Sequence, residues 1–173
     1  QGFDTGILVA SPGNTLVGNY IGQLGTDGNI GGGSTNLFGI VVRAAGNTIG
    51  GTVAGDRNVV SGNSTANITL DSASATGNVV TGNYIGTNAA GTAALLNTAN
   101  GINVLAGAAQ IGGTTAASGN VISGNDQNGV QLLTSGSTLL FNDIGTAADG
   151  VTAIPNAGDG VYIDGSDNII GST

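Results

Sequence analysis

The side chains of this chain that could perform acid–base or metal chemistry are almost all aspartates. Its 173 residues include ten acidic residues, all of them Asp, two Arg, and no Lys, His or Cys. The least scattered carboxylates are Asp126, Asp143 and Asp149. With loop carbonyls they could hold calcium, which takes about six to eight oxygen ligands, or two of them could form a glycosidase pair. The simplest interpretation, which we favour, is that all three are solvated loop carboxylates, with calcium as the alternative ligand.

The two basic residues offer little for catalysis. Arg43 and Arg57 fall at different places in the repeat pattern described below. The pattern predicts that Arg43 points outward one turn below Asp71, and a surface ion pair of this kind contributes about 0–1 kcal/mol. We therefore predict no catalytic residue, no enzymatic activity, and no cofactor other than the calcium considered above.

Composition excludes several classes of function. The formal net charge is -8, which disfavours nucleic acid, because its binding depends on Lys and Arg neutralising phosphates. The same charge disfavours anionic membrane surfaces, and no apolar run approaches the roughly 18 residues of a membrane span. Hydrophobic residues reach 39% and recur at fixed places, so the chain is not disordered. Without cysteine, no disulfide supports the fold and the redox compartment stays open.

Near copies of one short segment recur along the chain. Residues 13–22 (GNTLVGNYIG) and 77–86 (GNVVTGNYIG) are almost identical, and residues 136–145 (GSTLLFNDIG) are a weaker copy. Shorter relatives occur at 57–63 (RNVVSGN) and 119–125 (GNVISGN). A second motif, usually Gly followed by aliphatic, any residue and aliphatic, alternates with the first and has the period of two that is typical of a short strand. This self-similarity indicates a repeat array.

The spacing of the aliphatic residues predicts three short strands in each turn. From the first strand to the second it is 9 residues in five turns, as from Ile7 to Leu16, and 12 only from Ile68 to Val80. The distance from the second strand to the third alternates between 5 and 11 residues. The distance from the third strand to the first strand of the next turn alternates in the opposite sense, so the repeat unit is two turns, about 61 residues. Turns of this kind are typical of stacked solenoids. We predict an all-β fold, a right-handed parallel β-helix of about five turns, as a single domain over residues 1–173.

In this arrangement the inward aliphatic residues form columns that run from turn to turn. The first strands contribute Ile7, Ile40, Ile68, Ile102, Val130 and Val161, followed two residues later by Val9, Val42, Leu70, Val104, Leu132 and Ile163. The second strands contribute Leu16, Ile49, Val80, Ile111, Leu139 and Ile170, and the third strands Ile21, Val60, Ile85, Ile122 and Ile144. Asparagines at the corners are expected to form hydrogen-bonded ladders between turns.

Some apolar residues are expected to face outward. They are Leu8, Val41, Leu105 and Leu133 beside or at the end of the first strands, and Tyr20, Val59, Tyr84 and Val121 on the third strands, interrupted at Asp143. Contiguous apolar stripes mark contact surfaces more often than scattered residues do. Either these stripes bind another molecule or a loop of the same chain covers them.

The same motifs resemble a known family. The pattern of GNYIGT, GTAAL, GIxV, IGGT and GNVISGN is similar to the long arrays of secreted bacterial right-handed parallel β-helix proteins in the pectate-lyase-like superfamily. The resemblance implies this fold and an extracellular setting over nearly the whole chain. It implies no particular activity, because the superfamily includes lyases, hydrolases, tailspikes, adhesins and structural arrays.

These observations favour a structural function. We expect an extracellular repeat module of a cell-surface adhesin, sheath or filament, with a cell-surface or glycan partner as a further option. The alternative is a β-helix that binds or cleaves carbohydrate, for which aromatic residues, at 3%, are scarce. The last turn lacks a third strand and neither end has a cap, so Ile170 is expected to lie in an uncovered end. We therefore expect either a segment of a longer array or subunits that associate end to end.

Overall fold

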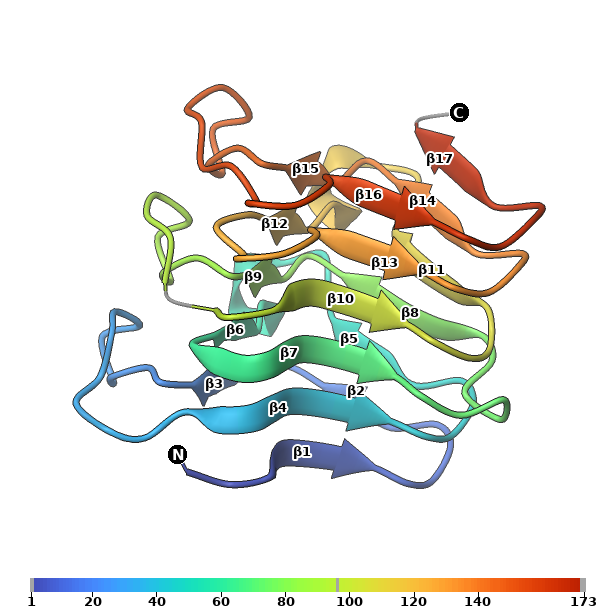
Figure 1. The fold of residues 1–173 in the computed structure, drawn as a ribbon, viewed down its shortest axis with the longest axis horizontal. Helices are drawn as coiled ribbons and strands as arrows, with labels where there is room; N and C mark the ends of the chain where they lie inside the picture. The colour runs from blue at the N-terminus through green and yellow to red at the C-terminus, as the bar shows by residue number, and fades with distance from the viewer. Residues whose placement is uncertain (1, 96, 172–173) are drawn as a thin grey trace.

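The computed structural model describes residues 2–95 and 97–171 and confirms the predicted architecture. The chain winds as a parallel β-helix in which each turn stacks on the previous one, as Figure 1 shows. Every pairing between the named strands is parallel and joins strands of successive turns.

Three sheets run along the molecule, each built from corresponding strands of successive turns. Sheet A contains β1 (Thr5–Val9), β4 (Asn36–Val42), β7 (Asn63–Leu70), β10 (Asn100–Val104), β13 (Val130–Leu132) and β16 (Val161–Ile163). Sheet B contains β2 (Thr15–Leu16), β5 (Thr48–Gly50), β8 (Asn78–Thr81), β11 (Ala109–Gly112), β14 (Thr138–Leu140) and β17 (Ile169–Gly171). Sheet C contains β3 (Tyr20–Gly22), β6 (Val59–Ser61), β9 (Tyr84–Ile85), β12 (Val121–Ile122) and β15 (Asp143–Ile144).

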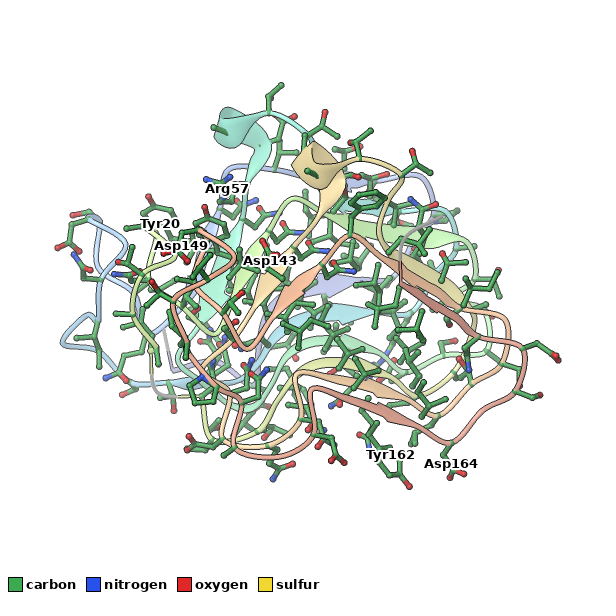
Figure 2. All side chains as sticks on the ribbon, turned by 90° about the horizontal axis from the view of Figure 1, so that it is seen from above. Tyr20, Arg57, Asp143, Asp149, Tyr162 and Asp164 are labelled. Carbon is green, nitrogen blue, oxygen red and sulfur yellow. The ribbon has the colours of Figure 1, made fainter. Side chains whose placement is uncertain are left out.

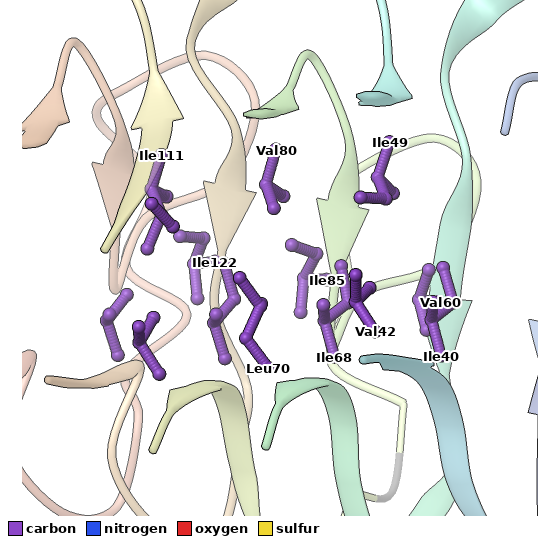
Figure 3. Close-up of a cluster of buried hydrophobic side chains, with 14 of the residues drawn as sticks. Ile40, Val42, Ile49, Val60, Ile68, Leu70, Val80, Ile85, Ile111 and Ile122 are labelled. Carbon is purple, nitrogen blue, oxygen red and sulfur yellow. The ribbon is translucent and has the colours of Figure 1, made fainter. Parts of the chain in front are cut away.

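The strand register places the predicted aliphatic columns inside the helix. In sheet A, for example, Ile40 pairs with Ile7 on one side and with Ile68 on the other. The central members of all the columns are fully buried in one continuous core, part of which Figure 3 shows. Each buried aliphatic side chain contributes about 1.5–3 kcal/mol. Ile163 and Ile170 are 44% and 45% exposed, because no described turn lies over them.

Asparagine side chains at the corner before sheet C form an unbroken ladder. In each step Nδ2 donates to Oδ1 of the asparagine in the next turn, at distances between 2.8 and 3.0 Å. The members are Asn19, Asn58, Asn83, Asn120 and Asn142. The backbone N–H of each of the first four also donates to the same Oδ1. The ladder thus satisfies corner groups that would otherwise be buried without partners.

A second ladder, at the corner before sheet B, is interrupted. Asn14 Nδ2 donates to Asn47 Oδ1 at 3.0 Å, and Asn47 Nδ2 donates to Asn78 Oδ1 at 3.1 Å. The next residue in register is Ala109, which has no acceptor, and Asn78 Nδ2 is buried without a hydrogen-bond partner. Ser137 continues the column by accepting a hydrogen bond from the backbone N–H of Ala109.

In alternate turns, the residue directly before the asparagine of this unbroken ladder has a left-handed backbone. Gly18 and Gly82 have φ of +69° and +66° there, and Phe141 occupies the equivalent position with φ of +56°. A side chain with a Cβ is strained in this region, by about 1–2 kcal/mol. The structure therefore has a phenylalanine where the repeat favours glycine.

Two kinds of insertion alternate along the stack, as the spacing predicted. With the turns numbered from the N-terminus, the odd-numbered turns carry a lateral loop after the third strand, at residues 23–31, 87–95 and 146–154. Even turns carry a short 3-10 helix before the third strand, η1 (Ala54–Asp56) or η2 (Ala116–Ser118). The outward side of sheet C therefore lies between a row of loops and a row of 3-10 helices (Figure 2).

Candidate functional site

The outward side of sheet C gathers several of the side chains that could bind a ligand or take part in catalysis. Tyr20, Arg57, Asp143 and Asp149 lie on this side in Figure 2, well away from Tyr162 and Asp164 of the turn nearest the C-terminus. The register places Tyr20 and Tyr84 on the two sides of Val59, and Val121 between Tyr84 and Asp143. We treat this side of sheet C as the candidate site.

The lateral loops form a column of their own beside the site. Antiparallel bridges close them between Leu24 and Ile30, Thr87 and Ala94, and Thr146 and Ala153. The backbone N–H of Ala89 donates to Gly28 O, and that of Ala148 donates to Gly91 O, both at 2.9 Å. Loops of odd turns thus contact one another across the intervening even turns.

This loop column covers much of the predicted apolar stripe. Val59, only 2% exposed, packs with Leu24 and Leu95 of the loops, and Tyr84 is half-buried against the same cluster. Val121 is also buried, whereas Tyr20 is 49% exposed. Of the two explanations that the sequence left open for this stripe, a covering loop is correct for Val59 and accounts for the partial burial of Tyr84.

The two tyrosines of the site rest on loop glycines. A Cβ added to Gly28 would lie 3.2 Å from Cε2 and Cζ of Tyr20, and one added to Gly91 would lie 2.8 Å from Cε2 of Tyr84. The Arg57 guanidinium carbon lies 4.0 Å from the centroid of the Tyr84 ring, in a cation–π contact. This stack was not predicted from the sequence, where Arg57 had no expected partner and Tyr84 was expected to be an exposed contact residue. The repeat pattern carries no signal for it, because the residue in register with Arg57 is Gly82 and not Tyr84.

Two of the three predicted calcium ligands do interact. The partial desolvation of the Asp143 carboxyl raises its pKa, and the charge of Asp149 raises it further. Asp149 accepts hydrogen bonds from Thr152 Oγ1 and from the backbone N–H groups of Thr152 and Val151, at 2.6 to 2.9 Å. The Thr152 hydroxyl, followed by these amides, lowers the pKa of Asp149 to about 2. The loop turn therefore already engages both Asp149 oxygens.

Asp126 is not part of a metal-binding cluster with this pair. Within residues 2–95 and 97–171, no group of three or more His, Cys, Asp or Glu side chains is arranged to hold a metal ion. Asp27 of the first lateral loop resembles Asp149, because its carboxylate accepts hydrogen bonds from the backbone and side chain of Asn29, which lower its pKa. Calcium binding remains a prediction for Asp126, Asp143 and Asp149.

On sheet A, the expected ion pair is present. Arg43 Nη2 lies 2.8 Å from Asp71 Oδ2, and Nε lies 3.0 Å from Oδ1, so the pair is bidentate between successive turns. Both side chains retain solvent contact, which keeps the contribution of the pair small.

The expected apolar stripe of sheet A is only partly exposed. Leu8 is exposed, as are Leu105 and Leu133 at 39% each. Val41 was expected to be exposed on this surface, and that expectation is wrong, because it is only 3% exposed. It lies in register between Leu8 and Thr69, whose chains flank it at the strand spacing of about 4.8 Å and leave little room for water.

Comparison with known proteins finds no matching family model, no curated protein of significant sequence similarity and no solved structure of significant similarity. Among the described residues, no helix is long and apolar enough to cross a membrane. Any assignment of function to this chain therefore depends on its own geometry.

Proposed function

We propose that this chain is a structural repeat module of an extracellular surface protein, such as an adhesin, a sheath or a filament. The observation that carries the proposal is the unbroken asparagine ladder at the corner before sheet C. It uses buried polar groups to lock five successive turns together, which favours a rigid rod.

Several other polar side chains also hold the fold together. Arg43 and Asp71 connect two turns, and Asp27 and Asp149 close lateral loops. These side chains are therefore engaged within the described fold, whereas a catalytic site requires polar groups that converge on a substrate. The secreted bacterial setting belongs to the same proposal and is supported by the motifs that resemble secreted β-helix arrays.

In this proposal the module associates with copies of itself, end to end or laterally. The exposed apolar residues Leu8 on β1, and Leu105 and Leu133 directly after β10 and β13, support lateral association, because apolar patches often mark contact surfaces. Sedimentation velocity and negative-stain electron microscopy of the purified chain test the proposal. Ordered filaments or concentration-dependent oligomers are the expected result.

A matched pair of variants makes this test specific. The double variant Leu105→Ser and Leu133→Ser should weaken lateral association. Val151→Ser should leave it unchanged, because Val151 is exposed in a lateral loop away from sheet A. A chain that stays monomeric at all concentrations and forms no ordered filament would contradict the proposal.

A β-helix that binds or cleaves carbohydrate is the second candidate. The specific observation in its favour is that Tyr20 shares one side of sheet C with Asp143 and Asp149, two carboxyls whose pKa values shift in opposite directions. It ranks second because the Asp149 carboxylate is already engaged by its own loop. Assays for reducing ends and unsaturated products on uronic-acid polymers, with and without calcium, test it. Turnover that Asp143→Asn or Asp149→Asn abolishes would favour this candidate over the structural one.

A further inference from the structure

Arg57 differs from the other basic residue of the chain in having no acidic partner among the described residues. Arg43 is paired with Asp71, whereas in the part of the chain that the structure describes no carboxylate lies within ion-pair distance of Arg57. The neighbouring Asp56 does not fill this role, because its carboxylate lies close to the backbone of Gly51. Arg57 is therefore the one described cation that is not neutralised in a chain of net charge -8.

The guanidinium of Arg57 is held in a fixed orientation. One side lies over the Tyr84 ring at 4.0 Å, and Nε donates to Gly82 O at 3.3 Å. The ring is itself held in place, because Gly91 of the second lateral loop lies against its Cε2 and Cζ edge. An arginine side chain fixed in this way has already lost most of its conformational freedom, which reduces the cost of binding.

The two terminal NH2 groups of Arg57 are available for a ligand. The only hydrogen bond that the Arg57 side chain donates to the described residues comes from Nε, and the side chain is half-buried rather than fully covered. The terminal edge of a guanidinium presents two parallel N–H donors that match the two oxygens of a carboxylate. We propose that Arg57, stacked on Tyr84, is a binding site for a single carboxylate group.

The charge of the protein selects among anions. A phosphate dianion carries more negative charge into the field of a chain with net charge -8, so it meets more repulsion than a monovalent carboxylate does. Two sources provide such a carboxylate, a free organic acid or an aspartate side chain of a second copy. The binding chemistry at Arg57 is the same in both cases.

The test titrates the ¹⁵N-labelled chain with sodium acetate, sodium phosphate and sodium chloride at equal ionic strength and pH 7. The expected result is a saturable shift of the Arg57 Nε–H and Tyr84 ring signals in acetate, with weaker binding of phosphate and no saturation in chloride. Arg57→Gln should weaken the response of the Tyr84 ring to acetate at least about tenfold. Arg43→Gln removes the same charge elsewhere and should leave that response unchanged, and circular dichroism checks that both variants fold.

Sedimentation velocity over a range of protein concentrations separates the two sources. If the protein associates, and both Arg57→Gln and added acetate prevent the association, the carboxylate comes from an aspartate of a second copy. If the protein stays monomeric and acetate gives a saturable response, the carboxylate comes from a free organic acid. Either result supports the proposal. The proposal is overturned if acetate causes neither effect, if phosphate binds as tightly as acetate, or if Arg57→Gln responds like the wild type. The carboxylate site does not depend on the proposed structural function. If the chain forms filaments but does not bind acetate, the carboxylate site is overturned and the structural function is not.

Discussion

Replacing Asn83 with alanine would remove the central rung of the unbroken ladder. The Asn83 side chain is fully buried and takes part in five hydrogen bonds. Nδ2 donates to Ile49 O, Thr81 O and Asn120 Oδ1, and Oδ1 accepts from the backbone N–H and Nδ2 of Asn58. The two Nδ2 hydrogens are shared among these three acceptors, so the side chain makes about four full hydrogen bonds, and at about 1 kcal/mol for each Asn83→Ala should lower the free energy of unfolding by about 4 kcal/mol. For a chain of this size, that corresponds to a fall in Tm of roughly 8–16 °C.

Urea unfolding followed by far-ultraviolet circular dichroism measures this change. The matched control is Asn14→Ala, the same substitution at an exposed rung of the second ladder. It should cost less than about 1 kcal/mol, because water replaces the lost partners of an exposed amide. If the two variants lose similar stability, or if Asn83→Ala loses less than about 1 kcal/mol, the ladder does not hold the turns together as we infer.

Three further substitutions test individual features. Ala109→Asn should raise the free energy of unfolding by about 1 kcal/mol, because it gives the buried Nδ2 of Asn78 an acceptor, and a lower urea midpoint would contradict this. Phe141→Asn should raise Tm by relieving a left-handed backbone that asparagine tolerates, and no gain would show that Phe141 is not strained. The depressed pKa of Asp149 means that its support of the third loop is complete above its ordinary pKa of 3.8 and is lost as pH falls towards about 2. The Thr152 amide resonance in NMR should report this transition, and Asp149→Asn should remove it.

The fold could be predicted from the sequence because a solenoid repeats its constraints. Each inward position, such as that of Ile68, is specified again in every turn by an aliphatic residue at the same spacing. If one strand had been predicted at the wrong residues, its aliphatic side chain would not have matched those of the neighbouring turns in the column. The corner asparagines were predictable for the same reason, since the ladder requires one in each turn.

The surface was less predictable, because outward positions are not subject to the same constraint. Alternation correctly placed Val41 on the outward side, but exposure also depends on the size of its neighbours in adjacent turns, which a strand pattern does not report. The covered Val59 depended on how the lateral loops fold back, and the stack of Arg57 on Tyr84 depended on side-chain orientation. Both are contacts between segments whose spacing carries no periodic signal.

The contacts between lateral loops restrict how such a chain can change its length. The second loop donates to Gly28 O and the third to Gly91 O, so each loop requires another loop two turns away. Deleting or duplicating one turn would place two turns of the same kind next to each other and break the alternation between loops and 3-10 helices. Deleting or duplicating two turns would preserve every contact of this kind. Variants produced by unequal recombination should therefore survive in steps of about 61 residues, and the array can gain or lose length only in pairs of turns.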